Sequence, residues 1–460
     1  MATTWEVDSK SVPGPSSWLP GGSFLAFRRD PLGFFTRTAR TYGDIAHFTF
    51  GPQQVYLVSH PEWIEDILVT SAKKFKKGVA LQRAKRLLGE GLLTSEGKAH
   101  LRQRRTIQPL FHRQQVQRFA ETMVRHAVRW RDSLSPNAAI DVTAEMGGLT
   151  LAIVGETLFS SNVQGDADEV REALTDAVQS FAYALLPGIE VMEKLPLPMF
   201  TRVRKARERL DRVVHRVIAE RRSQPEGGND LVSMLLAARD PENPAEGMSD
   251  MQIRDEAMTI FLAGHETTAN AMAWTWHLLA GAPAIERRLH EEIDRVLDGR
   301  TPAVEDVPKL EYTRGVIAES MRLYSPAWTM GRRVVERHNI GGFDLEPNAL
   351  VIASQWVVHR DPRWWTAPDE FKPERWLTGP EHFAVAAALG SSQRPRYAYF
   401  PFGGGSRVCI GESFAWTELI LLLATIAQQW RFTPSVKPPV PEPRITLRPK
   451  GLLMQTQRRS

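Results

Sequence analysis

The single cysteine of this 460-residue chain, Cys409, lies in a glycine-rich segment from Phe400 to Gly411. An apolar helical run from Glu412 to Trp430 follows at once. The unpaired amides and positive dipole end at a helix N-terminus favour a thiolate over a thiol. An isolated cysteine is also often an inert core residue. The residue types alone therefore leave two interpretations open, a reactive thiolate and a buried structural cysteine.

A second chemically capable segment lies inside an apolar stretch. Ser249-Asp250-Met251-Gln252 has the form of a capping box, and the residues from Ile260 to Leu279 predict a helix suited to burial. Within it, Ala263-Gly264-His265-Glu266-Thr267-Thr268 carries an acid and hydroxyls, which are costly to bury unless they have partners or a function. A zinc motif His-Glu-x-x-His is excluded because Ala269 occupies the position of the second histidine.

The elements that must position these segments are mostly helical. Two short strands, Ile45 to Phe50 and Gln54 to Val58, flank a turn, and a helix begins at Pro61 and continues to about Leu68. Residues Arg444 to Gln457 predict a terminal hairpin. No repeat or linker divides the chain. We therefore expect one large, mainly α domain over 23–460 with a small β region, preceded by a flexible, proline-rich N-terminus over 1–22.

Charge and cysteine usage limit the environment and the partners. The formal net charge is only +5, and the basic run from Arg202 to Arg222 alternates with acids and an apolar stripe. That run predicts a solvated amphipathic helix and no nucleic-acid binding. One cysteine cannot form an intrachain disulfide, which favours a cytoplasmic location. No apolar run of 18 residues is present, so we expect no membrane-spanning segment.

The cysteine segment matches a known signature. Phe402, Gly405, Arg407, Cys409 and Gly411 fit Phe-x-x-Gly-x-Arg-x-Cys-x-Gly without a mismatch, and residues 263–268 fit Ala-Gly-x-Glu-Thr-Thr. In both respects the chain resembles the cytochrome P450 superfamily. The resemblance implies the triangular, helix-rich fold of that family and haem b with Cys409 as the axial thiolate, which favours O–O cleavage.

The same resemblance assigns site residues. For the activation of O2 it implies three residues: Gly264, Glu266 and Thr267. For haem it implies His100, Arg104, Arg332, Phe402, Arg407, Cys409 and Gly411, with His100 standing where the family usually has tryptophan. The structural residues behind the haem are Glu319, Arg322 and Arg375. The substrate pocket would include Leu81, Phe181, Leu185, Ala263, Ala327, Trp328 and Leu453.

These residues predict a soluble, monomeric monooxygenase that inserts one oxygen atom from O2 into an apolar organic substrate such as a fatty acid, terpenoid or polyketide. The chain holds no flavin or iron–sulfur module, so electrons would come from a separate ferredoxin or flavodoxin with its reductase. Lys98, Arg102 and Arg105 are candidates for docking an acidic partner. A peroxide-driven haem-thiolate peroxygenase or isomerase and a non-catalytic haem sensor remain alternatives.

Overall fold

A computed structural model describes residues 11–15, 22–159, 198–223, 230–377, 394–434 and 437–459. The chain divides into two compact units, each assembled from separate stretches of sequence. Unit 1 consists of residues 1–78, 327–370 and 378–409. Unit 2 consists of residues 79–326, 371–377 and 410–460. The sequence boundary between the units falls directly after Cys409.

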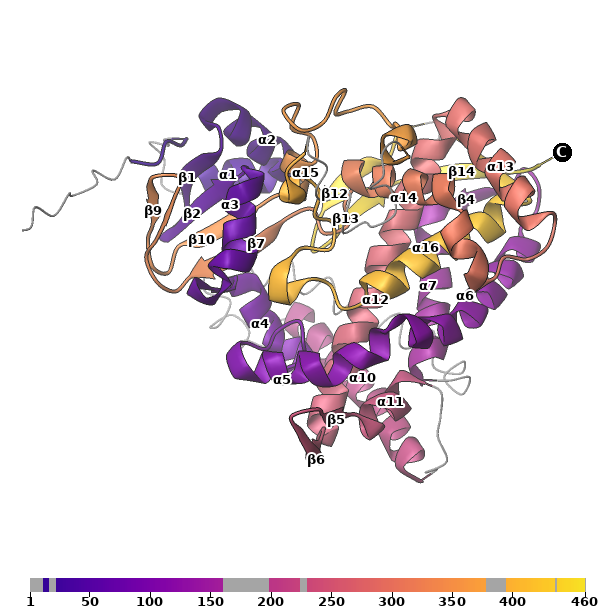
Figure 1. Ribbon diagram of the computed structural model, residues 1–460, viewed down its shortest axis with the longest axis horizontal. Coiled ribbons are helices and arrows are strands. Elements are labelled where there is room, and N and C mark those ends of the chain that lie inside the picture. Colours follow the sequence, from indigo (N-terminus) through magenta and orange to yellow (C-terminus); the bar gives the residue numbers. More distant parts are fainter. Residues whose placement is uncertain are drawn as a thin grey trace, which may run out of the picture. The chain divides into compact units, whose positions relative to one another are not determined.

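Unit 1 is built on a five-stranded sheet with the order β1-β2-β10-β7-β3 (Figure 1). Its strands are β1 (Ile45–Phe50), β2 (Gln53–Val58), β3 (Phe75–Lys77), β7 (Met330–Val334) and β10 (Leu350–Ala353). A separate pair consists of β8 (His338–Ile340) and β9 (Phe343–Leu345). Neighbouring strands are antiparallel except β2 and β10, which run parallel and join distant parts of the chain. The two strands predicted around residue 51 are therefore confirmed.

The helices of unit 1 are short. They are α1 (Gly22–Arg29), α2 (Pro31–Tyr42), α3 (Pro61–Glu65), η1 (Asp66–Thr70), η2 (Ala72–Lys74), α15 (Gln355–Val358), η7 (Arg396–Ala398) and η8 (Gly405–Arg407). The helix predicted to begin at Pro61 changes to a π-helical turn in η1. Apolar residues of the sheet pack with Tyr397 and Phe400 in one core, so the segment that leads to Cys409 is anchored on this sheet.

Unit 2 is mainly helical and contains the longest helices of the described residues (Figure 1). They are α4 (Val79–Leu88), α5 (Gly97–Ile107), η3 (Gln108–Phe111), α6 (Arg113–Ser133), α7 (Val142–Phe159), α10 (Pro198–Ser223), α11 (Leu231–Ala237), α12 (Asp250–Ala280), α13 (Pro283–Leu297), η5 (Val304–Lys309), α14 (Glu311–Leu323), η6 (Pro373–Trp376) and α16 (Glu412–Ala427). The predicted amphipathic helix is α10, which buries Leu210, Val213 and Val217.

Helix α12 is the central element of unit 2 and packs against α7, α10, α14 and α16. Its start is fixed by the predicted capping box. The Gln252 amide N–H donates to Ser249 Oγ over 3.3 Å, and the Ser249 amide N–H donates to Gln252 Oε1 over 2.9 Å. These two bonds satisfy backbone donors that a helix N-terminus otherwise leaves unpaired.

Small sheets complete unit 2, and they correct one prediction. The strands are β4 (Ala139–Asp141), β5 (Arg239–Asp240), β6 (Asn243–Gly247), β11 (Trp430–Thr433), β12 (Val440–Pro443), β13 (Leu447–Lys450) and β14 (Leu453–Arg458). The expected hairpin of β13 with β14 was wrong. Strand β13 pairs with β12, whereas β14 pairs with β11 and β4. The turn at Gly451 sends the chain from one sheet to another, which local turn chemistry cannot reveal.

Candidate active site

The Cys409 loop in unit 1 is a series of backbone turns. The Gly403 amide donates to Phe400 O over 3.0 Å, the Val408 amide to Gly405 O over 3.1 Å, and the Cys409 amide to Phe402 O over 2.9 Å. The side chain of Cys409 is exposed although Phe400, nine residues earlier, is buried. The loop therefore presents the sulfur on an open face while its base is held in the core.

One glycine of this loop is required by both conformation and space. Gly405 has a φ of +64°, in the left-handed region that residues with a Cβ rarely adopt. A Cβ at this position would lie 2.1 Å from the carbonyl oxygen of Leu68 in η1. The backbone atom cannot rotate away as a side chain could. The signature glycine thus allows the loop to lie directly on η1.

Distant side chains of unit 1 hold the base of the loop. The Phe400 amide donates to Nε2 of the buried His359 over 3.0 Å, and Trp365 Nε1 donates to Ala398 O over 3.3 Å. Because Nε2 accepts this hydrogen bond, the His359 ring is neutral with its proton on Nδ1. His359 and Phe400 are 41 residues apart, so this contact could not be inferred from spacing.

Two arginines of unit 1 that were predicted to contact haem, Arg332 on β7 and Arg407 on η8, are half-buried. Arg332 Nη1 donates to the Gly331 carbonyl over 3.0 Å. Trp328, a predicted pocket residue, is 4% exposed and its ring lies 5.9 Å from that of Phe35.

In unit 2, the middle of α12 is unusually open. Ala263 is exposed and residues 264–267 are half-buried, whereas the turns on both sides are mostly buried. The helix is continuous through Gly264. Thr267 Oγ1 donates to the Ala263 carbonyl over 2.6 Å. One turn that carries the predicted acid and hydroxyl is therefore accessible within a helix that otherwise forms the core.

Glu266 is held by two polar residues that the sequence did not indicate. Thr446 Oγ1 donates to Glu266 Oε1 over 2.8 Å, and Asn270 Nδ2 donates to Thr446 Oγ1 over 3.0 Å. Burial raises the pKa of Glu266 above its ordinary value, and the Thr446 hydroxyl with the charges of Arg448 and Arg444 opposes that rise. The carboxyl thus titrates closer to neutral pH than an exposed glutamate, as proton transfer near pH 7 requires.

A buried carboxyl lies next to this turn. Glu418 on α16 is fully buried, and burial raises its pKa to about 8, with a smaller opposing effect from the Thr268 hydroxyl. His265 is also desolvated, which lowers its pKa to about 4. At neutral pH both groups therefore remain largely uncharged beside Glu266 and Thr267.

The three predicted structural residues meet in one buried cluster. Glu319 and Arg322 on α14 have no exposed surface, and Arg322 donates to Glu319 from Nε over 2.9 Å and from Nη2 over 2.8 Å. Arg375 Nε and Trp376 Nε1 each donate to Glu319 over 2.9 Å, and the Lys372 amide donates over 3.0 Å. Full satisfaction of the carboxylate offsets the cost of burying its charge.

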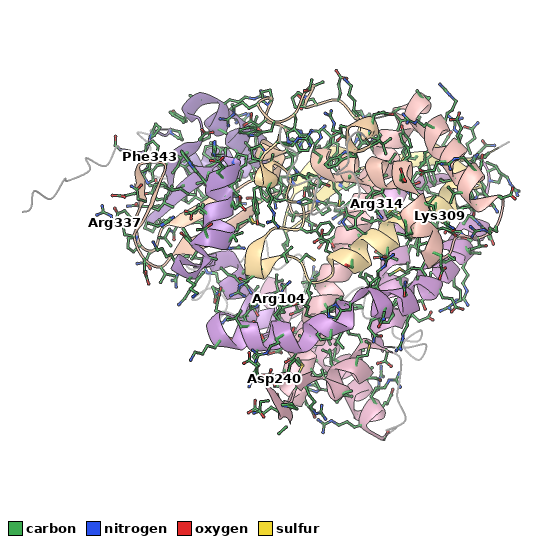
Figure 2. All side chains as sticks on the ribbon, viewed as in Figure 1. Arg104, Asp240, Lys309, Arg314, Arg337 and Phe343 are labelled. Atoms are coloured by element: carbon green, nitrogen blue, oxygen red, sulfur yellow. The ribbon has the colours of Figure 1, made fainter. Side chains whose placement is uncertain are left out.

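Helix α5 carries His100 and Arg104, which are four residues apart and on one face. His100 is 3% exposed, and its Nδ1 lies 3.2 Å from the carbonyl oxygen of Leu92. Figure 2 shows Arg104 on this helix and Asp240 on the neighbouring strand β5. Arg105 donates to both carboxylate oxygens of Asp240, over 2.9 Å each. The face of α5 that carries His100 therefore contacts Leu92, whereas Arg105 contacts Asp240 on β5.

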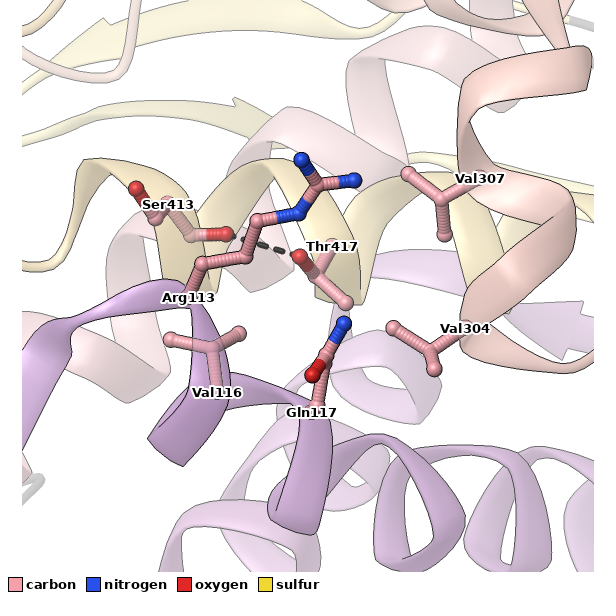
Figure 3. A pocket seen from close by; sticks show the side chains of 7 residues that line it. All are labelled: Arg113, Val116, Gln117, Val304, Val307, Ser413 and Thr417. Carbon is pink, nitrogen blue, oxygen red and sulfur yellow. Dashed lines mark hydrogen bonds between the residues drawn. The ribbon is translucent and has the colours of Figure 1, made fainter.

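The remaining pocket residues are distributed as follows. Leu81 on α4 and Ala327 are half-buried, and Leu453 on β14 is 59% exposed. Phe181 and Leu185 lie outside the described residues. A small cavity of about 50 Å³ in unit 2 is lined by Arg113, Val116, Gln117, Val304, Val307, Ser413 and Thr417 (Figure 3). It has room for water but not for an organic substrate of ordinary size.

The family model "Cytochrome P450" matches residues 12–457. Cyclooctatin synthase of Streptomyces melanosporofaciens is 38% identical over 98% of this chain and 97% of its own length. Cyclooctat-9-en-7-ol 5-monooxygenase of the same organism is 35% identical over 92% of each chain. Pentalenene oxygenase of Streptomyces avermitilis is 35% identical over 88% of this chain and 87% of its own length.

The chain belongs to the cytochrome P450 family, which confirms the resemblance and the helix-rich fold class. It is a monooxygenase, an oxidoreductase that incorporates oxygen from O2 into an organic substrate. The family implies a haem iron with a thiolate ligand, an apolar substrate and a source of electrons. Within the described ranges, no helix combines the length and apolar character that a membrane span requires.

The residues present fit such a group. In unit 1 an exposed thiol is carried on a loop that is rigidly seated on the core, with the half-buried Arg332 and Arg407 as donors for carboxylates. In unit 2 the opened turn of α12 and the donors of α5 supply an acid, hydroxyls and further cations. The Cys409 sulfur is a soft ligand that suits iron, and the arginine guanidinium groups are planar cations that suit propionates.

Proposed function

We propose that Cys409 is the axial ligand of haem b and that the chain hydroxylates a terpenoid substrate. When bound, the haem supplies the redox chemistry that activates O2, so that one oxygen atom enters the substrate and the other leaves as water. The observation that carries the proposal is the exposed Cys409 on a loop fixed by its own backbone hydrogen bonds. Arg332, Arg407, His100 and Arg104 would bind the haem carboxylates, and Phe402 and Gly411 would frame the sulfur.

Glu266 would deliver the protons that this reaction consumes, and Thr267 would accept a hydrogen bond beside it. The Glu266 carboxyl takes up a proton from solvent and is oriented by Thr446. The Thr267 oxygen retains lone pairs while its hydrogen is donated to Ala263 O, so it accepts a hydrogen bond without leaving the helix. Gly264, beside them, contributes no side chain to the open turn. Glu266 and Thr267 thus provide an acid and a hydroxyl on consecutive residues.

The substrate class follows from the relatives. Two of them are named for oxygenation of cyclooctat-9-en-7-ol and of pentalenene, and each matches most of this chain. A terpenoid of this kind offers apolar surface and few polar groups. Leu81, Ala263 and Ala327 supply small or apolar lining residues that suit it. Binding of such a compound would be measured as a shift of the ferric haem from low to high spin.

One experiment separates the roles of the two segments. The wild-type protein, reduced under carbon monoxide, should give the red-shifted Soret band of thiolate-ligated haem. Cys409→Ser should lose that band together with all turnover. Thr267→Ala should keep the band and lower the product formed per O2 consumed. Absence of the band in the wild-type protein refutes Cys409 ligation.

The electron donor would be a separate ferredoxin or flavodoxin with its reductase. Docking on α5 is weaker than the sequence indicated, because two of its three basic residues already have acidic partners. Arg105 binds Asp240, and Arg102 Nη1 lies 3.2 Å from Glu246 Oε2 on β6. Lys98 is exposed. The acids of the β5–β6 hairpin would therefore compete with an acidic donor protein for α5.

Removal of one hairpin charge tests this competition. Glu246→Gln releases Arg102, so the KM for an acidic ferredoxin should fall about two- to threefold at low salt, consistent with the small energy of an exposed ion pair. The difference from wild type should vanish at high ionic strength because exposed charges are screened. Asp294→Gln, which removes an exposed acid from α13, serves as the control. Equal KM values for all three proteins at low salt would contradict docking on α5.

A further inference from the structure

The backbone N–H and C=O of Leu92 join α12 to α5 through two hydrogen bonds. Its N–H donates to Glu256 Oε2 on α12 over 2.9 Å, and its carbonyl oxygen lies 3.2 Å from His100 Nδ1 on α5. Glu256 is fully buried and Leu92 is 8% exposed. The Leu92 carbonyl therefore determines which nitrogen of His100 carries a proton.

A carbonyl oxygen only accepts hydrogen bonds, so His100 Nδ1 must be the donor in this contact. In a neutral imidazole the other nitrogen, Nε2, is then an acceptor. It becomes a donor only when the ring is protonated on both nitrogens. The contact with the Leu92 carbonyl therefore favours the tautomer with Nδ1 protonated.

The segment that presents Leu92 is fixed at several other points. The Glu90 amide donates to Asp255 Oδ2 over 2.7 Å, and Gln103 Nε2 donates to Glu90 O over 2.6 Å. Thr94 Oγ1 donates to Gly89 O over 2.6 Å. The Leu92 carbonyl therefore cannot turn away from His100 without breaking bonds to α12 and α5.

We propose that His100 contacts a haem propionate only when one proton is shared between its Nε2 and that carboxylate, which makes haem retention dependent on pH. The proposal rests on the assignment of His100 as a propionate ligand. A tryptophan in this position would donate from its indole N–H at every pH. Histidine held by Leu92 lacks that donor unless the pair takes up a proton, so the substitution changes the contact from permanent to conditional.

The charged groups around His100 act in opposite directions. Arg104, one turn further on the same face, opposes protonation of His100, whereas Glu256, which accepts from the Leu92 N–H, favours it. Glu96, one turn earlier, accepts from Gln82 Nε2 over 3.3 Å, and Ser95 Oγ lies 3.5 Å from His100 Nδ1. The acids of β5 and β6 bind Arg105 and Arg102, away from this site. A neutral Nε2 facing a carboxylate would place two lone pairs together, and one proton removes that repulsion.

Haem transfer from the loaded full-length protein to excess apomyoglobin tests the proposal between pH 6 and pH 9. Release of haem from wild type should accelerate roughly tenfold or more as pH rises, because one charge-assisted hydrogen bond is lost. His100→Gln places an amide donor where Nε2 was and should release haem slowly at every pH. His100→Asn places its amide where Nδ1 was, keeps the Leu92 contact and should release haem rapidly at every pH.

A release rate of wild type that does not change with pH would overturn the proposal, as would the wild-type pH dependence persisting in His100→Gln. If neither variant retains haem, the ferric/ferrous midpoint potential of wild type decides. It should become more positive as pH falls, and an unchanged potential overturns the proposal. The thiolate band under carbon monoxide is recorded in parallel. Its absence would refute Cys409 ligation, whereas a normal band with pH-independent release refutes only the shared proton.

Discussion

The Cys409 loop of unit 1 and the opened turn of α12 in unit 2 are built in opposite ways. The loop obtains its shape from backbone hydrogen bonds between residues at most seven apart and from Gly405 lying on η1. The α12 turn has ordinary helical backbone and obtains its character from distant side chains, above all Thr446. Local backbone geometry thus fixes the proposed ligand, whereas long-range side chains adjust the proposed proton donor. Substitutions in the loop should accordingly lower the stability of the fold. Substitutions around the α12 turn should instead shift the pKa of its carboxyl groups.

The largest effect is expected from Gly405→Ala. The new Cβ meets the Leu68 carbonyl at 2.1 Å in a backbone with φ of +64°, which should cost more than about 3 kcal/mol when the clash and the conformational strain combine. Gly342→Ala is the matched control in unit 1. It has a φ of +84° but no atom within 4 Å of the added Cβ, so only about 1–2 kcal/mol should be lost.

Thermal unfolding and the thiolate band of both glycine variants measure this difference. Gly405→Ala should unfold at a lower temperature and show a smaller thiolate band per protein than Gly342→Ala. Equal losses in the two variants would mean that positive φ alone matters and that contact with η1 does not shape the loop.

Glu418→Gln should have the next largest effect, and it concerns pH. Burial raises the pKa of Glu418 from 4.5 to about 8, so the folded state prefers the neutral acid. This stabilisation is complete below the unfolded pKa and is lost as pH rises through about 8. Wild type should therefore lose about 2–4 kcal/mol of unfolding free energy between pH 5 and pH 9 that Glu418→Gln does not lose. Urea unfolding of both proteins at the two pH values measures it, and parallel pH dependence would show that Glu418 is ionised throughout.

Thr446→Val should change stability least, by about 1 kcal/mol, because the hydrogen bond to Glu266 is lost. It should raise the pKa of Glu266, since the Thr446 hydroxyl lowers that pKa. The alkaline limb of the pH profile for product formed per O2 should then move to higher pH, because the proton-donating form of Glu266 persists further. Thr446→Ser keeps the hydroxyl and should behave as wild type. If Thr446→Val leaves the profile unchanged, the α12 turn does not depend on distant side chains.

Local signals predicted much of the fold and some of the site. The strands beside Gly51 and the capping box at Ser249 depend on neighbouring residues, and both are present in the structure. The pairing of Glu319 with Arg322 likewise spans one helical turn. By contrast, the contact of Thr446 with Glu266 joins residues 180 apart, and that of Glu256 with Leu92 joins residues 164 apart. Such contacts depend on how helices and strands pack, which no single segment encodes.

Strand β14 pairs with β4, and this pairing connects points that are far apart in time during synthesis. Thr456 Oγ1 accepts from the Ala138 amide 318 residues earlier, immediately before the β4–α7 segment. At roughly 5–20 residues per second, β4 leaves the ribosome about 15–60 s before its partner strand exists. Helices α7 and α12 both emerge before β14, so β4 has no strand partner during that interval. A slow, chaperone-sensitive step of folding is therefore expected when β14 emerges, and chains truncated before Leu453 should accumulate in an aggregation-prone state.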